Sequence, residues 1–140
     1  MASPPVVAIL NSNDDVVEML RLVIEQKGLV AVSGRIDKIR RGEASLSDLM
    51  EKHNPEVIIY DLVPPYDRNW RFLDHIRQAP GLAGRKFIIT SSNAQRAREI
   101  IGNVEHVFEI VGKPYDIQQI AEVVLRAVGR SELPDNARRV

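Results

Sequence analysis

Five short apolar runs recur along the chain, separated by segments with helical periodicity. Near-continuous apolar runs of this length are typical of strands in a parallel sheet, because those strands are buried on both faces. Strands that alternate with helices predict an α/β fold, with helices on both faces of the sheet. The predicted strands are Val6–Leu10, Leu29–Val32, Val57–Tyr60, Phe87–Thr90 and Val107–Val111.

Helical patterns fill the spaces between these runs. Gly28 is expected to end the first helix, and Asp116 with Gln119 forms a capping-box pattern at the start of the last. Residues 33–43 are polar and basic and are predicted to be a long loop. For this chain length we predict a flavodoxin-like sheet in the order 2-1-3-4-5. The predicted helices are 14–27, 45–53, a segment around 70–76, 93–101 and one from 116 onward.

Length and composition limit the class of protein. The 140 residues predict one domain over 1–130, followed by a polar tail at 131–140. Basic and acidic residues number 19 each, so no net field favours nucleic acid or an anionic membrane. The absence of cysteine excludes disulfides and thiolate metal sites. With no signal-peptide pattern and no long apolar run, we expect a soluble cytoplasmic protein.

Opposite charges follow two of the predicted strands. Asp61 comes directly after Val57–Tyr60, and Lys113 follows the fifth strand through Gly112. The hydroxyl pair Thr90-Ser91 ends the fourth strand. Carboxyl ends of parallel strands meet at one edge of an open sheet, so these side chains are predicted to share a site. Alternation places one of the two hydroxyls toward that site, and spacing slightly favours Ser91.

Simpler interpretations exist for several of these residues. Asp61 could be a turn residue, and Lys113 by itself could be a surface lysine. Asp14 and Asp15 are expected to be first-turn residues that complement the helix dipole. The basic residues of the predicted loop are either solvated or available to a partner, and they are Arg35, Lys38, Arg40 and Arg41.

The ordered set of strand-end residues resembles the receiver domain of bacterial two-component response regulators. The matching features are Asp61 with Pro65 four residues later, Thr90-Ser91, and Lys113-Pro114-Tyr115. Asp61 lies 52 residues before Lys113, a spacing that the family commonly shows. The resemblance covers roughly residues 5–129, and it rests on the ordered set, since each motif alone is weak.

This resemblance implies a phosphorelay signalling domain that is not itself an enzyme. Asp61 would be the phosphoacceptor, a carboxylate nucleophile that takes a phosphoryl group from a sensor histidine kinase or phosphotransfer protein. Thr90 or Ser91 would hydrogen-bond the phosphoryl oxygens, and Lys113 would pair with them. The resemblance implies neither membrane insertion nor direct nucleic-acid binding. It also implies docking or homodimerisation through the fourth-helix, fifth-strand and fifth-helix face.

The chain departs from the family where magnesium is held. The acidic pair expected after the first strand is replaced by Asn11-Ser12, whose oxygens are neutral. Mg²⁺ prefers octahedral oxygen ligation with one or two carboxylates. Asp61, Asn11 and Ser12 are therefore expected to bind Mg²⁺ weakly, unless Asp14 or Asp15 reaches over from the helix.

Three functional hypotheses follow from this pattern. In the first, Asp61 still accepts a phosphoryl group. In the second, the chain is a pseudo-receiver, an interaction module in which Asp61 and Lys113 form a structural pair. The third is a small flavodoxin-like enzyme or cofactor binder, which the absence of a glycine-rich phosphate loop disfavours.

Overall fold

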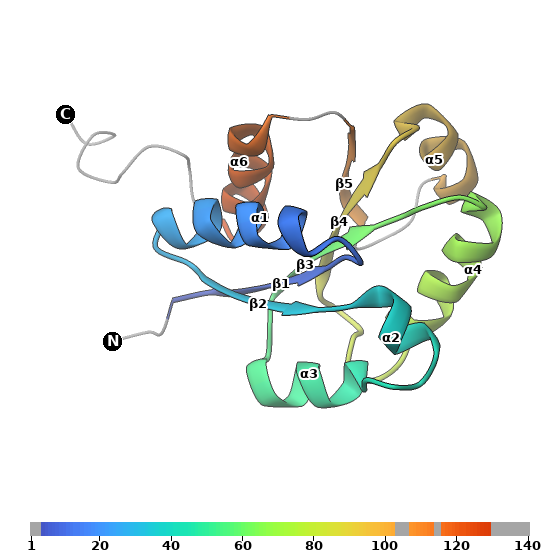
Figure 1. Cartoon of the computed structure of the whole chain (residues 1–140), viewed down its shortest axis with the longest axis horizontal. Helices are drawn as coiled ribbons and strands as arrows, with labels where there is room; N and C mark the ends of the chain where they lie inside the picture. The colour runs from blue at the N-terminus through green and yellow to red at the C-terminus, as the bar shows by residue number, and fades with distance from the viewer. Residues whose placement is uncertain (1–3, 103–106, 114–115, 130–140) are drawn as a thin grey trace.

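The computed structural model describes residues 4–102, 107–113 and 116–129, and it contains the predicted five-stranded parallel sheet. The strand order is β2-β1-β3-β4-β5, as predicted, with β3 in the middle of the sheet (Figure 1). The predicted tail at 131–140 lies outside the described residues. The strands are β1 (Val6–Leu10), β2 (Val30–Gly34), β3 (Val57–Asp61), β4 (Lys86–Ser91) and β5 (Val107–Gly112).

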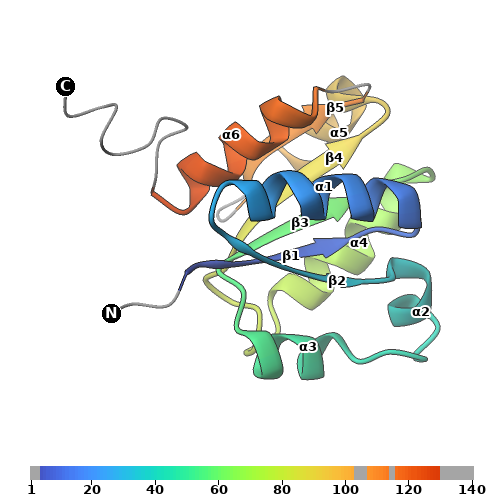
Figure 2. The same ribbon diagram turned by 60° about the vertical axis from the view of Figure 1, so that its left-hand side comes forward.

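Helices cover both faces of the sheet. One face is covered by α1 (Asp14–Gln26) and α6 (Ile117–Ala127), which lie side by side in both views (Figures 1 and 2). The other face carries the remaining helices, which are α2 (Ile36–Arg40), α3 (Leu46–His53), α4 (Tyr66–Arg77) and α5 (Ala94–Ile101).

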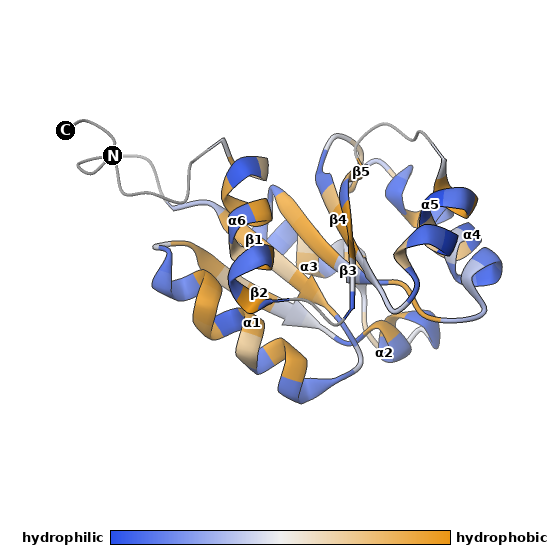
Figure 3. Ribbon diagram, turned by 90° about the horizontal axis from the view of Figure 1, so that it is seen from above, coloured by the Kyte–Doolittle hydropathy of each residue, from blue (hydrophilic) through white to orange (hydrophobic). Residues whose placement is uncertain are grey.

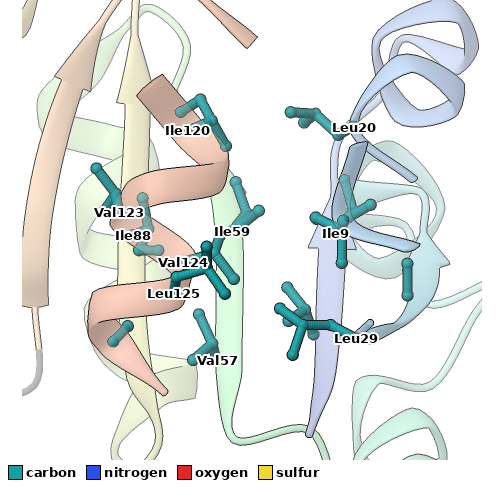
Figure 4. Packing of buried hydrophobic residues seen from close by; sticks show 14 of the residues in the cluster. Ile9, Leu20, Leu29, Val57, Ile59, Ile88, Ile120, Val123, Val124 and Leu125 are labelled. Carbon is teal, nitrogen blue, oxygen red and sulfur yellow. The ribbon is translucent and has the colours of Figure 1, made fainter. Parts of the chain in front are cut away.

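Two apolar clusters, one on each side of the sheet, make up the core. Figure 4 shows the first, in which Ile120 and Val124 of α6 and Leu20 of α1 pack over Ile9 and Ile59 of the strands. The colouring in Figure 3 shows apolar strands between helices that are polar on their outer sides. This pattern is what a parallel sheet buried on both faces requires. None of the helices in the described ranges is long and apolar enough to span a membrane.

Capping residues fix where the outer helices begin and end. Asn13 caps α1, and its side chain accepts the backbone N–H groups of Asp15 and Val16. Gly28 follows the helix at φ 82°, a left-handed conformation that favours glycine, as the sequence predicted. Asp116 caps α6 by accepting the N–H of Gln118, so the capping position was predicted correctly.

The structure corrects one prediction about the connection between β2 and α3. Residues 33–43 were expected to be a long loop, but Ser33 and Gly34 extend β2 and Ile36–Arg40 forms the short helix α2. Ile36 is buried, and Ile39 packs against the same cluster one turn later. These two apolar side chains dock α2 onto the sheet, which the surrounding charges obscured in the sequence.

Candidate functional site

Three strand ends bring Asp61, Thr90 and Lys113 together at the carboxyl edge of the sheet. Asp61 is the last residue of β3, and it is paired in register with Thr90 of β4. Lys113 follows β5 directly, and its backbone N–H donates to the carbonyl oxygen of Ser91 at 2.7 Å. Pro114 and Tyr115 lie outside the described residues.

A single oxygen of Asp61 receives both of the polar contacts. Lys113 Nζ lies 2.6 Å from Asp61 Oδ1, and Thr90 Oγ1 donates to the same oxygen at 2.7 Å. Asp61 is only 7% exposed, so its charge is compensated within the protein. No hydrogen bond within the described residues uses Oδ2, which leaves the second carboxylate oxygen available for chemistry.

Thr90, and not Ser91, presents its hydroxyl to Asp61. Paired residues of adjacent parallel strands have side chains on the same face, which places Thr90 beside Asp61. Ser91 points the other way, and its Oγ accepts the N–H of Asn93 at 3.1 Å. The slight preference for Ser91 drawn from spacing therefore does not match the geometry.

The two neutral residues after β1 are engaged with other groups. Asn11 is buried, and its Oδ1 accepts the N–H of Asn13 at 2.9 Å. Ser12 Oγ accepts the backbone N–H of Asp37 at 3.2 Å and donates to the Asp37 carboxylate at 3.4 Å. Their oxygens therefore organise the start of α1 and of α2.

Asp14 and Asp15 occupy the first turn of α1, where they complement the helix dipole. Asp14 forms an ion pair with Arg35 at 2.8 Å, on the outside of the molecule. Neither carboxylate lines the pocket beside Asp61, so the structure does not show the recruitment considered from the sequence.

This donor set does not fit a magnesium site. An octahedral Mg²⁺ needs free oxygen ligands, usually with one or two carboxylates. Asp61 offers only Oδ2, because Oδ1 already has a lysine and a hydroxyl donor. Asn11 Oδ1 is bonded to a backbone N–H, and arginines hold both oxygens of the Asp37 carboxylate. In the part of the chain that the structure describes, no group of three or more His, Cys, Asp or Glu side chains could hold a metal ion.

A pocket of about 100 Å³ opens beside Asp61, and α2 forms one of its walls. Asp37 and Arg40, both from α2, were not among the site residues predicted from the sequence. The signal that could have placed them is the apolar pair Ile36 and Ile39, at helical spacing within the charged segment. The lining residues are Ser12, Ile36, Asp37, Arg40, Asp61 and Val63.

Arginines on both sides hold the Asp37 carboxylate. Arg35 Nε and Nη2 bond its two oxygens at 3.2 and 3.1 Å, and Arg41 Nη1 lies 3.8 Å away. The hydrogen bond and charge of Arg35 lower the pKa of Asp37 below its ordinary value. Arg41 also pairs with Glu43, at 2.6 Å. Two of the four basic residues of this segment are therefore committed to ion pairs.

Arg40 has different surroundings from its neighbours. Its guanidinium carbon lies 5.6 Å from the centre of the Phe72 ring, a cation–π contact with α4. Burial raises the pKa of the nearby Tyr60 hydroxyl, and the positive charge of Arg40 opposes that rise. Arg40 forms no ion pair with any residue in the described ranges.

Two hydrogen bonds shape the loops around the pocket. Asn69 is buried in α4 and donates from Nδ2 to the carbonyl oxygen of Val63 at 2.6 Å. The hydroxyls of Tyr66 and Ser92 lie 2.7 Å apart, which joins the loop after β3 to the loop after β4. These contacts tie the loop after β3 to helix α4 and to the loop after β4.

Receiver domains are among the solved structures that resemble this chain, whereas no protein-family model and no curated protein sequence matches it. A signal receiver domain of a two-component histidine kinase from Clostridium thermocellum has a TM-score of 0.71 and 17% identity. The match covers 89% of this chain and 97% of that one. A response regulator from Thermotoga maritima has a TM-score of 0.70 and 11% identity, covering 90% and 98%.

A third structure agrees with these two. The CheY-like receiver domain from Methylobacillus flagellatus has a TM-score of 0.65 and 16% identity, covering 89% of this chain and 99% of that one. At such identities a structural match establishes the fold, and these matches span nearly the full length of both chains. The chain therefore has the fold of a response-regulator receiver domain.

Proposed function

We propose that this chain is the receiver of a two-component phosphorelay and that Asp61 accepts the phosphoryl group. One observation supports this most directly: the carboxylate has Lys113 and Thr90 on Oδ1, while Oδ2 has no partner in the described residues. The solved structures with this fold include a sensor protein and a signal receiver domain of a two-component histidine kinase, which supports a histidine kinase or phosphotransfer protein as the partner. We place this exchange in the cytoplasm.

The transfer follows from the arrangement of donors. Oδ2 attacks phosphorus, and the bond from phosphorus to the donor nitrogen breaks with its electron pair remaining on nitrogen, which takes a proton from solvent. Oδ1 then becomes the carbonyl oxygen of a mixed anhydride and loses its charge. Lys113 Nζ is thereby released to pair with the phosphoryl oxygens, and the Thr90 hydroxyl remains close enough to donate to them.

Intact mass after incubation with acetyl phosphate tests this proposal, with and without Mg²⁺. We expect a mass increase of one phosphoryl group in the wild type and none in Asp61→Asn. Asp61→Asn is a suitable control because an amide oxygen can still accept the hydrogen bond from Thr90. If labelling, meaning the gain of one phosphoryl group from acetyl phosphate, persists in Asp61→Asn, the acceptor is another residue.

A pseudo-receiver is the second candidate function. The observation that favours it is the close pair between Lys113 and Asp61, together with a donor set that does not fit magnesium. In that case the pair is structural and partners bind without phosphorylation. The absence of labelling under both conditions would support this candidate over the first.

A further inference from the structure

The charged residues that line the pocket beside Asp61 are one arginine, Arg40, and two carboxylates, Asp37 and Asp61, each of which already has a cationic partner. Arg40 and Asp37 come from the helix α2, which lies between β2 and α3 and forms one wall of the pocket. The question is which of its charges is available to a ligand.

Arg40 is the available charge on this wall. Arg35 is paired with Asp14 and Asp37, and Arg41 is paired with Glu43 and Asp37. Arg40 lines the pocket and forms no ion pair with a described residue. Asp37, the second carboxylate of the pocket, is already neutralised by arginines and so repels an incoming anion little.

A cation–π contact holds the Arg40 side chain beside α4. Its guanidinium carbon lies 5.6 Å from the centre of the Phe72 ring. This contact uses no hydrogen bond of the guanidinium, so its N–H donors stay available for an oxyanion. The contact also reduces the conformational entropy that the side chain would lose on binding.

Arg40 and Asp61 line the same pocket without forming an ion pair with each other. Space therefore remains between the guanidinium and the carboxylate, and a group attached to Asp61 would lie in it. We propose that this pocket binds the phosphoryl group on Asp61 through Arg40 and Lys113, and that it needs no divalent cation. This inference rests on the proposed function of Asp61 as phosphoacceptor.

The charges around the pocket favour a bound oxyanion over a bound divalent cation. Both carboxylates of the lining are already paired, Asp37 with two arginines and Asp61 with Lys113, so a cation would find no unpaired carboxylate and would be repelled by Arg40. An oxyanion on Asp61 would have Arg40 and Lys113 as ligands. Charge-assisted bonds from a guanidinium to phosphate are among the stronger hydrogen bonds in proteins.

The test follows the rate of labelling by acetyl phosphate with intact mass, in excess EDTA and in excess Mg²⁺. For the wild type we expect the two rates to agree within about twofold. We expect Arg40→Gln to reduce the rate in EDTA by about tenfold or more, since the charge-assisted bonds are lost. Arg40→Lys keeps the charge and should recover part of the rate.

Lys38→Gln is the matched control. Lys38 is exposed on the same short helix and the substitution removes the same charge, but Lys38 does not line the pocket. We expect its labelling rate to stay within about twofold of the wild type. Thermal unfolding of each variant shows whether it is folded. The comparison of the wild-type rates in EDTA and in Mg²⁺ tests the inference without any substitution.

The outcomes separate this inference from the proposed function. Labelling of the wild type only in Mg²⁺ would overturn the inference and leave Asp61 as phosphoacceptor. Equal labelling of Arg40→Gln and wild type in EDTA would also overturn it. The absence of labelling in both buffers would instead refute the proposed function itself.

Discussion

Thr90 and Ser91 are adjacent hydroxyl residues, but their side chains lie on opposite faces of the sheet and have different hydrogen-bond partners. Thr90 Oγ1 donates to Asp61, whereas Ser91 Oγ accepts the N–H of Asn93 at the start of α5. The first hydroxyl therefore belongs to the site, and the second to the turn between β4 and α5.

We expect Thr90→Val to slow phosphorylation of Asp61 by about tenfold, because it removes a hydrogen bond to a charged group and keeps the shape of the side chain. Ser91→Ala should leave that rate within about twofold and reduce the free energy of unfolding by about 1 kcal/mol. Intact mass against time and urea unfolding measure the two effects. The reverse ranking of the two variants would show that Ser91 is the site hydroxyl.

The neutral side chains of Asn11 and Ser12 predict weak binding of Mg²⁺ at the site. Because their oxygens are neutral and already bonded, the wild type should show no saturable response to Mg²⁺ at submillimolar concentration. Fluorescence of Trp70, the only tryptophan, measures it. Replacing both residues with Asp should increase the affinity for Mg²⁺, although Asp at position 12 would lie next to Asp37. A saturable wild-type response would contradict this prediction.

The sequence was sufficient to predict that Asp61 and Lys113 meet, since both follow apolar strands of one parallel sheet. It was not sufficient to choose between Thr90 and Ser91. The choice depends on the register of β4 against β3, and residues at the end of an apolar run do not show that register.

At the scale of elements, α2 is the part of the fold that most affects the site. It is five residues long, and it brings both Asp37 and Arg40 to the pocket. Its position depends on Ile36, which is 5% exposed and packs with Leu10 and Tyr60 in the core. Removing that apolar anchor should release the helix.

We expect Ile36→Ala to reduce the free energy of unfolding by about 2–5 kcal/mol, the usual range for truncating a buried isoleucine. Because Arg40 would lose its support, labelling of Asp61 in EDTA should also fall. Urea unfolding and intact mass measure the two effects. Leu46→Ala, in the same cluster on α3, is the control: it should reduce stability without the loss of labelling.

The ion pair of Asp37 predicts how α2 depends on pH. Its pKa in the folded state lies below the ordinary value of 3.8, chiefly because Arg35 bonds the ionised form. A lowered carboxyl pKa contributes stability above the unfolded-state pKa, and that contribution is lost as pH falls through the folded-state pKa. The free energy of unfolding should therefore fall more steeply below about pH 4 in the wild type than in Asp37→Asn. Parallel pH profiles in urea unfolding would contradict this.

Short helices such as α2 are difficult to predict because they offer little periodicity. Only Ile36 and Ile39 mark its buried side, and four basic residues nearby make the segment look solvated. Tertiary packing stabilises such a helix more than local propensity does. The longer helices were predicted within a few residues, because several turns of apolar spacing identify each of them.

For the whole molecule, the sequence predicted the strand order and the two helical layers, since apolar strands and helical connections permit few arrangements. What it could not predict is which surface meets a partner. The expected face consists of α5, β5 and α6, where Arg126 pairs with Glu109 at 3.0 Å and Arg98 donates to the Ile110 carbonyl at 3.3 Å. Its exposed polar residues include Arg96, Arg98, Gln118, Glu122 and Arg126.

We expect this face to form a modest self- or partner contact that does not depend on phosphorylation, in keeping with the polar character of transient interfaces. Sedimentation at several concentrations should give the same association for wild type and Asp61→Asn. Arg126→Gln removes one charge from the face and should weaken it. Association of the phosphorylated wild type alone would instead indicate an ordinary phosphorylation switch.

The dimensions of the pocket also limit which donors can reach Asp61. A volume of about 100 Å³ has room for a few water molecules or one small tetrahedral group, and helix α2 and Val63 close its sides. A phosphoryl group carried at the tip of a narrow side chain, such as an imidazole ring, can enter. The base and sugar of a nucleotide would have to remain outside, so the pocket limits only the reacting end of a donor, and any recognition of the rest of the donor has to take place outside it.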